Sequence, residues 1–183
     1  MSVFGWIIFQ QNSGFDYENF EYWNLPWADY KAGFGSIDGN FWLGLEKVHL
    51  LTSSQPYRMR MEMQDGADEL WFSAEYWLFK IGEELNDKYR LEVDGYSGDA
   101  GNSLMYEGDY ANDGCFGCYI HNGMEFATYD QDNDLKVGEN CADFLGGGWW
   151  YNKCHWACLN LNMAPEWRPY FAALQSRMMI KPQ

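Results

Sequence analysis

Strict alternation of residue types between positions 57 and 65 is the feature that most constrains the fold. In the segment YRMRMEMQD, a large apolar residue alternates with a polar or charged one at every step. Successive side chains of a strand point to opposite faces, so this pattern predicts a strand whose buried face carries Tyr57, Met59, Met61 and Met63. Segments 69–82 and 88–101 continue the pattern with aromatic and β-branched residues bounded by glycine turns. We therefore predict a mostly antiparallel central sheet.

Shorter elements are expected on either side of these strands. The apolar runs at 3–12 and 122–129 are each typical of a short buried strand. Prolines and glycines bound a short helix over 27–31, and apolar residues at three- and four-residue intervals predict an amphipathic helix over 41–51. From about Ser97 onward, glycine, asparagine and aspartate become dense. This composition predicts a loop-rich region that has few regular backbone hydrogen bonds and is stabilised instead by cysteines and a metal ion.

Net charge restricts the class of partner. The 183 residues carry 12 Lys and Arg against 27 Asp and Glu, a formal net charge of −15. Phosphate binding needs a basic face, so this balance argues against nucleic acid and favours cations as partners. No apolar run approaches the roughly 20 residues that span a bilayer, and the opening MSVFGWIIFQQ lacks the basic region of a signal peptide. We expect no membrane insertion and one folded domain over residues 1–183.

Five cysteines all lie in the second half of the chain. In an acidic, tryptophan-rich chain they favour an oxidising compartment, with one or two disulfides and one thiol left over. A zinc site is the alternative, because the spacing of Cys115 and Cys118 is typical of zinc ligands. The remaining zinc ligands would then be Cys154, His155 and Cys158.

An acidic stretch raises the question of what holds its charges together. It places Asp130, Asp132 and Asp134 within five residues. Carboxylates at alternate positions suit Ca²⁺, which takes roughly 6–8 oxygen ligands. The stretch begins like the loop of a helix–loop–helix calcium site, but Leu135 stands where that loop needs glycine and Cys141 where it needs glutamate. A calcium loop of another kind and a set of aspartates that cap turns both remain open at this point.

Several long motifs, in order along the chain, resemble one protein family. They are GWIIFQQ, WADYKAGFGSIDGNFWLGLEKVHLLT, YRLEVDGYSGDAGNSL, HNGMEFATYDQDND and GGGWWYNKCHWACLNLN. The chain resembles the fibrinogen C-terminal domain family, which includes ficolins, tachylectins, angiopoietins and the globular ends of fibrinogen chains. We interpret it as ficolin- or tachylectin-like. The resemblance implies an α+β fold with a central, mostly antiparallel sheet, short helices and a loop-rich, calcium-binding lobe.

The resemblance also implies a set of metal ligands. Asp132 and Asp134 would bind Ca²⁺ through their side chains. Lys136 and Gly138 would bind it through their backbone carbonyls. Asp130 lies outside this implied set.

A ligand pocket is implied beside a disulfide between Cys141 and Cys154. In lectin members of the family, the backbone N–H groups that correspond to those of Cys154 and His155 hold an acetyl group. Leu145 would form an apolar wall of the pocket. The segment after residue 162 is shorter than in the family, so Tyr170 would replace part of a wall that is otherwise missing.

The cysteines depart from the family pattern. The first family disulfide is absent, so the N-terminal disulfide lobe is truncated, whereas Cys115, Cys118 and Cys158 are additions. We expect a tether between the Cys115–Cys118 loop and Cys158, which would brace the lobe beside the shortened segment.

Together these features predict a secreted recognition domain, stabilised by Ca²⁺, that binds acetylated sugars or related small polar ligands. The alternative is a protein–protein interaction module of the angiopoietin or fibrinogen type, in which the same region receives a protein receptor. No G-x-S-x-G, P-loop or H-E-x-x-H motif is present, so we expect no enzymatic activity. A homo-oligomer would form through upstream regions, which in this family often carry stalks.

Overall fold

The computed structural model describes residues 2–3, 5–14, 22–108, 117–161, 164–168 and 171–183. Its helices are α1 (Trp27–Ala32), α2 (Leu45–Ser54), α3 (Glu84–Asp87), α4 (Cys141–Leu145) and the short 3₁₀ helix η1 (Ser103–Met105). Its strands are β1 (Ser2–Val3), β2 (Trp6–Asn12), β3 (Phe34–Gly35), β4 (Phe41–Trp42), β5 (Tyr57–Asp65), β6 (Trp71–Ile81), β7 (Leu91–Gly98), β8 (Ala157–Cys158), β9 (Glu166–Trp167) and β10 (Phe171–Pro182).

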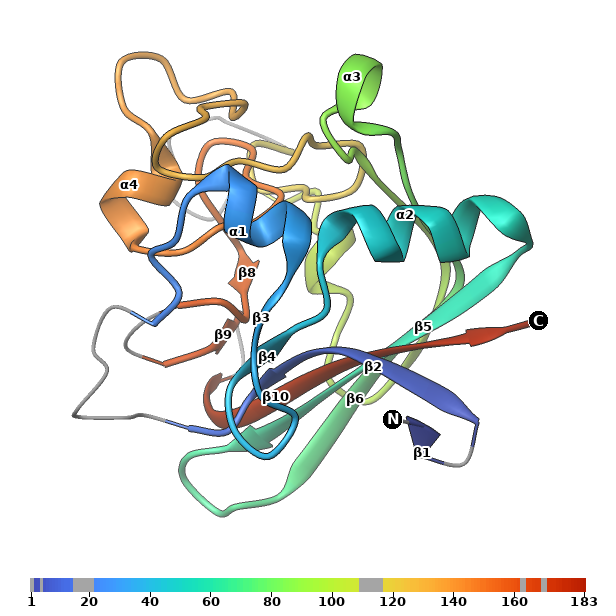
Figure 1. Cartoon of the computed structure of the whole chain (residues 1–183). Helices are drawn as coiled ribbons and strands as arrows, with labels where there is room; N and C mark the ends of the chain where they lie inside the picture. Colours follow the sequence, from blue (N-terminus) through green and yellow to red (C-terminus); the bar gives the residue numbers. More distant parts are fainter. Residues whose placement is uncertain (1, 4, 15–21, 109–116, 162–163, 169–170) are drawn as a thin grey trace.

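One antiparallel sheet organises the described residues. Its central path runs in the order β3-β4-β2-β10-β5-β6-β7. The strand β10 pairs with both β2 and β5, so the two ends of the described chain meet in the middle of the sheet. The helices α1 and α2 lie on one face of this sheet (Figure 1). The α+β architecture with an antiparallel sheet is as predicted, whereas the central position of β10 was not predicted.

The strand β5 confirms the alternation pattern. Tyr57, Met59, Met61 and Met63 are all buried, and the residues between them are partly exposed. Burying a methionine side chain contributes roughly 1.5–3 kcal/mol, so this face alone is a large part of the core. Aromatic side chains of the helices complete the core, because Trp27 and Tyr30 of α1 are buried against it.

Two sequence expectations about secondary structure are wrong. The helix predicted over 41–51 begins only at Leu45, because residues 41–42 form β4 and pair with β2 and β3. The chain passes from strand to helix at Gly44, whose φ is +111°. A Cβ at this position would lie 2.7 Å from the carbonyl oxygen of Ala32. The strand predicted over 122–129 is absent; that segment has only isolated bridges from Ala127 and Thr128.

None of the helices in the described part of the chain has the length and apolarity needed to cross a bilayer. The longest, α2, has 10 residues, whereas a membrane-spanning helix needs about 20.

The role of the methionine face can be tested by truncation. Met61→Ala should lower the free energy of unfolding by about 2–5 kcal/mol, because it opens a cavity in a fully buried site. Leu50→Ala is the control, since Leu50 is 59% exposed in α2, and it should change stability by less than about 0.5 kcal/mol. Urea unfolding followed by tryptophan fluorescence measures both values. Equal losses in the two variants would contradict the assignment of this face to the core.

Candidate functional site

Residues 129–140, the acidic loop, lead into α4 and are held by side-chain amides. The amide of Asn133 donates to the carbonyl of Phe126 at 2.7 Å. The amide of Asn140 donates to the carbonyls of Thr128 and Tyr129 at 3.0 and 3.2 Å. These bonds join the end of the loop to its beginning, so its shape does not depend on strand pairing. Asparagine suits this task because one side chain supplies two donors and an acceptor.

Asp132 and Asp134 lie at the centre of the acidic loop. The carboxylate of Asp134 accepts the backbone N–H groups of Lys136 and Cys141, each at 2.7 Å. Asp132 in turn accepts the N–H of Asp134 at 3.3 Å. Burial and the nearby negative charge of Asp132 raise the pKa of Asp134, although the two N–H donors oppose this. Neither carboxylate forms an ion pair with any described residue, so their mutual repulsion is not relieved by a basic side chain.

These residues fit a hard cation such as Ca²⁺ by the chemistry of their donors. Two adjacent carboxylates supply charged oxygens, and oxygen is the donor that Ca²⁺ prefers. The carbonyl oxygens of Lys136 and Gly138 accept no hydrogen bond from the described residues. Neither oxygen therefore loses a bond within the described chain if it becomes a metal ligand. Within the described ranges there is no cluster of three or more His, Cys, Asp or Glu side chains placed around one point. A cation here would therefore need backbone carbonyls and water as well as carboxylates.

Asp130 has a different role. Its carboxylate accepts the backbone N–H of Trp27 at 2.9 Å and the hydroxyl of Thr128 at 2.7 Å. Trp27 is the first residue of α1, where backbone N–H groups have no partner within the helix. Asp130 thus joins the acidic loop to α1.

Exposed apolar side chains surround the acidic residues. We call Tyr129, Leu135, Val137 and Phe144 the apolar rim; they are 42%, 54%, 100% and 68% exposed. The ammonium group of Lys136 lies over the ring of Phe144 at 5.7 Å, which shows that the loop and α4 meet at this surface. Sequence reasoning missed the rim, because three of its members stand alone among polar residues and give no periodic pattern.

A disulfide joins the acidic loop to the implied pocket. It links Cys141 with Cys154, the pairing that the resemblance implied. Cys141 begins α4, whose first N–H groups are capped by the side chain of Asn140. Leu145 ends α4, is partly buried and packs against the core. Cys154 has a φ of +68°, an unusual conformation for a residue other than glycine.

His155 follows this strained residue and is held by a partner that the sequence did not predict. Its Nε2 lies 3.0 Å from a carboxylate oxygen of Glu166 in β9. The hydrogen bond from His155, together with Arg168, lowers the pKa of Glu166 to about 2. The backbone N–H groups of Cys154 and His155 donate to no described residue.

The backbone beyond His155 is fixed by a buried imidazole. His121 is fully buried, and its Nδ1 lies 2.8 Å from the carbonyl oxygen of Trp150. Its Nε2 accepts the backbone N–H groups of Trp156 and Ala157, each at 3.0 Å. Only a neutral ring can donate from Nδ1 and accept at Nε2. Burial, reinforced by the charge of His155, lowers the pKa of His121 to about 3, so the ring remains neutral.

The structure corrects two expectations about the added cysteines. Cys158 is a free, buried thiol in β8, 3.4 Å from the hydroxyl of Tyr151, so the tether to Cys158 does not form. The zinc set is also wrong, because Cys118 and Cys154 are both disulfide-bonded and a sulfur in a disulfide is not a thiolate ligand. Cys115 lies outside the described residues, as does Tyr170, the residue expected in the pocket wall.

Comparisons with known proteins show which family and fold the chain is similar to. Residues 2–168 match the family model described as the C-terminal globular domain of fibrinogen beta and gamma chains. Human tenascin-R is 38% identical over 156 residues, which are 85% of this chain and 10% of tenascin-R. The chain thus spans about a tenth of that relative's length.

Two solved structures are similar throughout. The fibrinogen-like globe domain of human ANGPTL6 has a TM-score of 0.79 and 32% identity, covering 97% of this chain and 78% of that one. A lamprey fibrin D-dimer, complexed with the peptide Gly-His-Arg-Pro-amide, has a TM-score of 0.82 and 31% identity. That match covers 97% of this chain and 61% of the lamprey chain.

The neutral state of His121 predicts a pH dependence of stability. The pKa is depressed in the folded protein, so the stability that depends on the neutral ring is complete above about pH 6.5 and is lost as the pH falls towards 3. The slope contributed by this residue is about 1.4 kcal/mol per pH unit. In urea unfolding between pH 7 and 4, His121→Gln should be less stable at pH 7. As the pH is lowered, the stability of this variant should then fall less steeply than that of the unaltered protein. The difference between the two slopes should correspond to about one bound proton.

Other acidic groups titrate in both proteins, so the difference between the two slopes isolates His121. Parallel pH profiles for the variant and the unaltered protein would show that the imidazole does not titrate as described.

Proposed function

The chain belongs to the family of fibrinogen C-terminal globular domains, and we propose that it is an extracellular, non-catalytic module that binds a protein partner through the apolar rim of its acidic loop. Ca²⁺ would stabilise that loop. The three disulfide-bonded cysteines of the described residues, Cys118, Cys141 and Cys154, favour an oxidising compartment, as does the similarity to fibrinogen and tenascin-R.

The single observation that carries the proposal is the exposure of the rim. Val137 in the tightly bonded acidic loop is fully exposed, and Phe144 in the adjoining α4 is 68% exposed. Large apolar side chains held rigidly on a surface gain free energy only when another molecule covers them. Aromatic anchors surrounded by polar residues are typical of the energetic centre of protein interfaces. The lamprey relative, recorded with a peptide ligand, supports a polypeptide as the partner class.

Ca²⁺ would be held by the side chains of Asp132 and Asp134 and by the carbonyls of Lys136 and Gly138. When bound, the cation would neutralise the two carboxylates. The protein's own contacts fix the shape of the loop: Asn133 and Asn140 bond it to the carbonyls of Phe126 and Thr128. The disulfide from Cys141 fixes α4 beside it. The rim is then presented in one conformation, which reduces the entropy cost of binding.

Binding of an acetylated sugar, as in ficolins and tachylectins, is the second candidate. It is favoured by the backbone N–H groups of Cys154 and His155, which have no acceptor among the described residues. The side chain of His155 is less available, because it is 9% exposed and bonded to Glu166. We therefore favour the protein partner, and the pocket residues Cys154, His155, Leu145 and Tyr170 remain the site of this alternative.

Calcium binding can be tested by thermal unfolding. Adding Ca²⁺ to chelator-treated protein should raise the melting temperature, because a ligand that binds only the folded state stabilises it by about 2.7 kcal/mol at a hundredfold excess over Kd. Asp132→Asn combined with Asp134→Asn should abolish the shift. Asp143→Asn removes a neighbouring negative charge in α4 and should leave the shift intact. Identical melting curves with calcium and with chelator would refute the metal site.

The apolar rim can be tested by a binding screen. Recombinant extracellular domains captured by the unaltered protein should lose at least roughly tenfold in affinity to Val137→Ser and to Phe144→Ser. The matched control is Leu85→Ser, an 80% exposed apolar residue in α3, which should bind normally. Millimolar N-acetylglucosamine should not compete. Competition by this sugar, with loss of binding in His155→Ala but not in the rim variants, would instead support the second candidate.

A further inference from the structure

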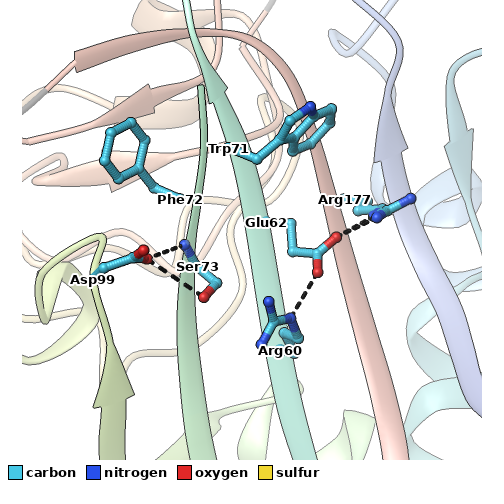
Figure 2. A pocket seen from close by; sticks show the side chains of 7 residues that line it. All are labelled: Arg60, Glu62, Trp71, Phe72, Ser73, Asp99 and Arg177. Carbon is cyan, nitrogen blue, oxygen red and sulfur yellow. Dashed lines mark hydrogen bonds and ion pairs between the residues drawn. The ribbon is translucent and has the colours of Figure 1, made fainter. Parts of the chain in front are cut away.

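A groove of about 250 Å³ lies on the sheet face opposite to α1 and α2, far in sequence from the acidic loop. It is formed by side chains of β5, β6 and β10, with Asp99 directly after β7 (Figure 2). Along β6, Trp71 is exposed and Ser73 is partly exposed, and Phe72 between them also lines the groove while packing partly against the core. Figure 2 shows Asp99 and Ser73 on one side, with Glu62, Arg60 and Arg177 on the other. The groove is independent of the site proposed above.

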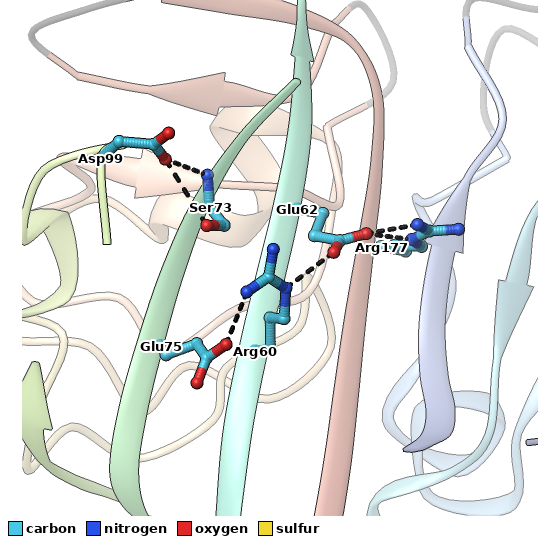
Figure 3. Close-up of polar contacts among 6 residues, drawn as sticks. All are labelled: Arg60, Glu62, Ser73, Glu75, Asp99 and Arg177. Carbon is cyan, nitrogen blue, oxygen red and sulfur yellow. Dashed lines mark hydrogen bonds and ion pairs between the residues drawn. The ribbon is translucent and has the colours of Figure 1, made fainter. Parts of the chain in front are cut away.

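A row of ion pairs makes one wall of the groove rigid (Figure 3). Arg60 donates from Nε to Glu62 at 2.7 Å and from Nη1 to Glu75 at 2.5 Å. Arg177 donates to the other oxygen of Glu62 through two of its nitrogens. Burial alone would raise the pKa of Glu62, but the two guanidinium groups outweigh it and lower that pKa. Arginines held in this way keep fixed donor directions.

The opposite wall is anchored to the backbone. One carboxylate oxygen of Asp99 accepts the backbone N–H of Ser73 at 2.7 Å and its hydroxyl at 3.5 Å. The register of the sheet places Ser73 opposite Glu62, and Glu62 opposite Arg177. The two walls therefore stand on neighbouring strands of one sheet, and their spacing is set by strand pairing.

Several polar atoms in the groove have no partner among the described residues. These are Nη2 of Arg60, Nη1 of Arg177 and the second carboxylate oxygen of Asp99. The first two are donors and the third is an acceptor, while the hydroxyl of Ser73 can act as either. A ligand that uses them must present both acceptors and donors on one small surface.

Trp71 supplies an apolar platform at the end of the groove. It is 46% exposed, and Arg177 lies over its ring at 5.4 Å. The contact with Arg177 restrains the ring while much of the indole remains open to solvent. An exposed indole of this kind stacks on flat, weakly polar molecular faces.

The charge balance of the lining selects the class of ligand. In the lining, Arg60 and Arg177 face Glu62 and Asp99, and Glu75 pairs with Arg60 just outside it, so the groove has no excess positive charge. An anion at the free guanidinium nitrogens would also lie beside the carboxylates of Glu62 and Asp99, and a cation at Asp99 would also lie beside the two guanidinium groups, so neither sign is favoured alone. A neutral molecule with hydroxyl groups, each a donor and an acceptor, satisfies the free atoms on both walls.

We propose that this groove binds a neutral, non-acetylated saccharide ring, stacked on Trp71 and hydrogen-bonded to Arg60 and Asp99. The volume is below the roughly 300–1,000 Å³ of most small-molecule sites, which suits a single ring. The end of a free polysaccharide and a glycan on another protein both present such a ring. The hydrogen-bonding groups of the ring are the same in the two sources. Binding here would add a second recognition surface on the face opposite to the helices.

The test follows the indole N–H signals of the isotope-labelled protein by NMR. The probes are the methyl glycosides of glucose, galactose, mannose and xylose at millimolar concentration, with acetate and methylammonium as charged controls. At least one glycoside should shift the Trp71 signal, assigned by its absence in Trp71→Phe, and the charged controls should not. Affinity should fall roughly tenfold in Trp71→Ala. It should also fall in Asp99→Asn, which keeps the oxygen that accepts from Ser73.

Trp77→Ala is the matched control, because Trp77 lies on the same strand and is 59% exposed. It should bind the glycoside with unchanged affinity. The proposal is overturned if no glycoside shifts the Trp71 signal, or if Trp77→Ala weakens binding as much as Trp71→Ala. Shifts caused by the charged controls alone would also overturn it. Retention of a glycoprotein before and after enzymatic deglycosylation, compared with the free polysaccharide, then identifies the source of the ring.

Discussion

The pairing of β10 with both β2 and β5 is the interaction on which the rest of the structure depends. It places residues 171–182 in the middle of the sheet, between strands from the first third of the chain. The first residues of β10 also pair with β9, and β9 pairs with β8. Through β9, Glu166 reaches His155, whereas the direct pairing of β10 with β5 brings Arg177 to Glu62. Both the implied pocket and the groove on the outer face are therefore set by one strand.

The acidic loop is organised without regular strand pairing, by polar side chains that bond to the backbone. Asn133 and Asn140 join its ends, Asp130 attaches it to α1, and the disulfide from Cys141 joins it to the turn that carries His155. Behind that turn, neutral His121 accepts two backbone N–H groups. A region rich in loops can be rigid when each buried polar group has a partner. That rigidity allows apolar side chains to remain exposed at its surface.

Local patterns predicted much of the fold because they follow from the period of a single element. The alternation that ends at Met63 placed β5 correctly, and the short helix at Trp27 is α1. The expected strand over 122–129 is wrong because its backbone bonds instead to separate partners, such as Trp149. The helix expected from residue 41 is wrong in its first turn, because pairing with β2 outweighed the apolar spacing. In both cases contacts distant in sequence overrode a local preference.

The sequence by itself determined the family and the antiparallel sheet, because motifs and periodicity are properties of neighbouring residues; its calcium loop stays a prediction. It also indicated the Cys141–Cys154 pairing through the family resemblance. Only the tertiary structure decided that Cys158 stays a free thiol, that Glu166 holds His155, and that Arg60, Trp71 and Asp99 line one groove. These outcomes join residues tens of positions apart, and their distances depend on strand order and register, which no local pattern contains.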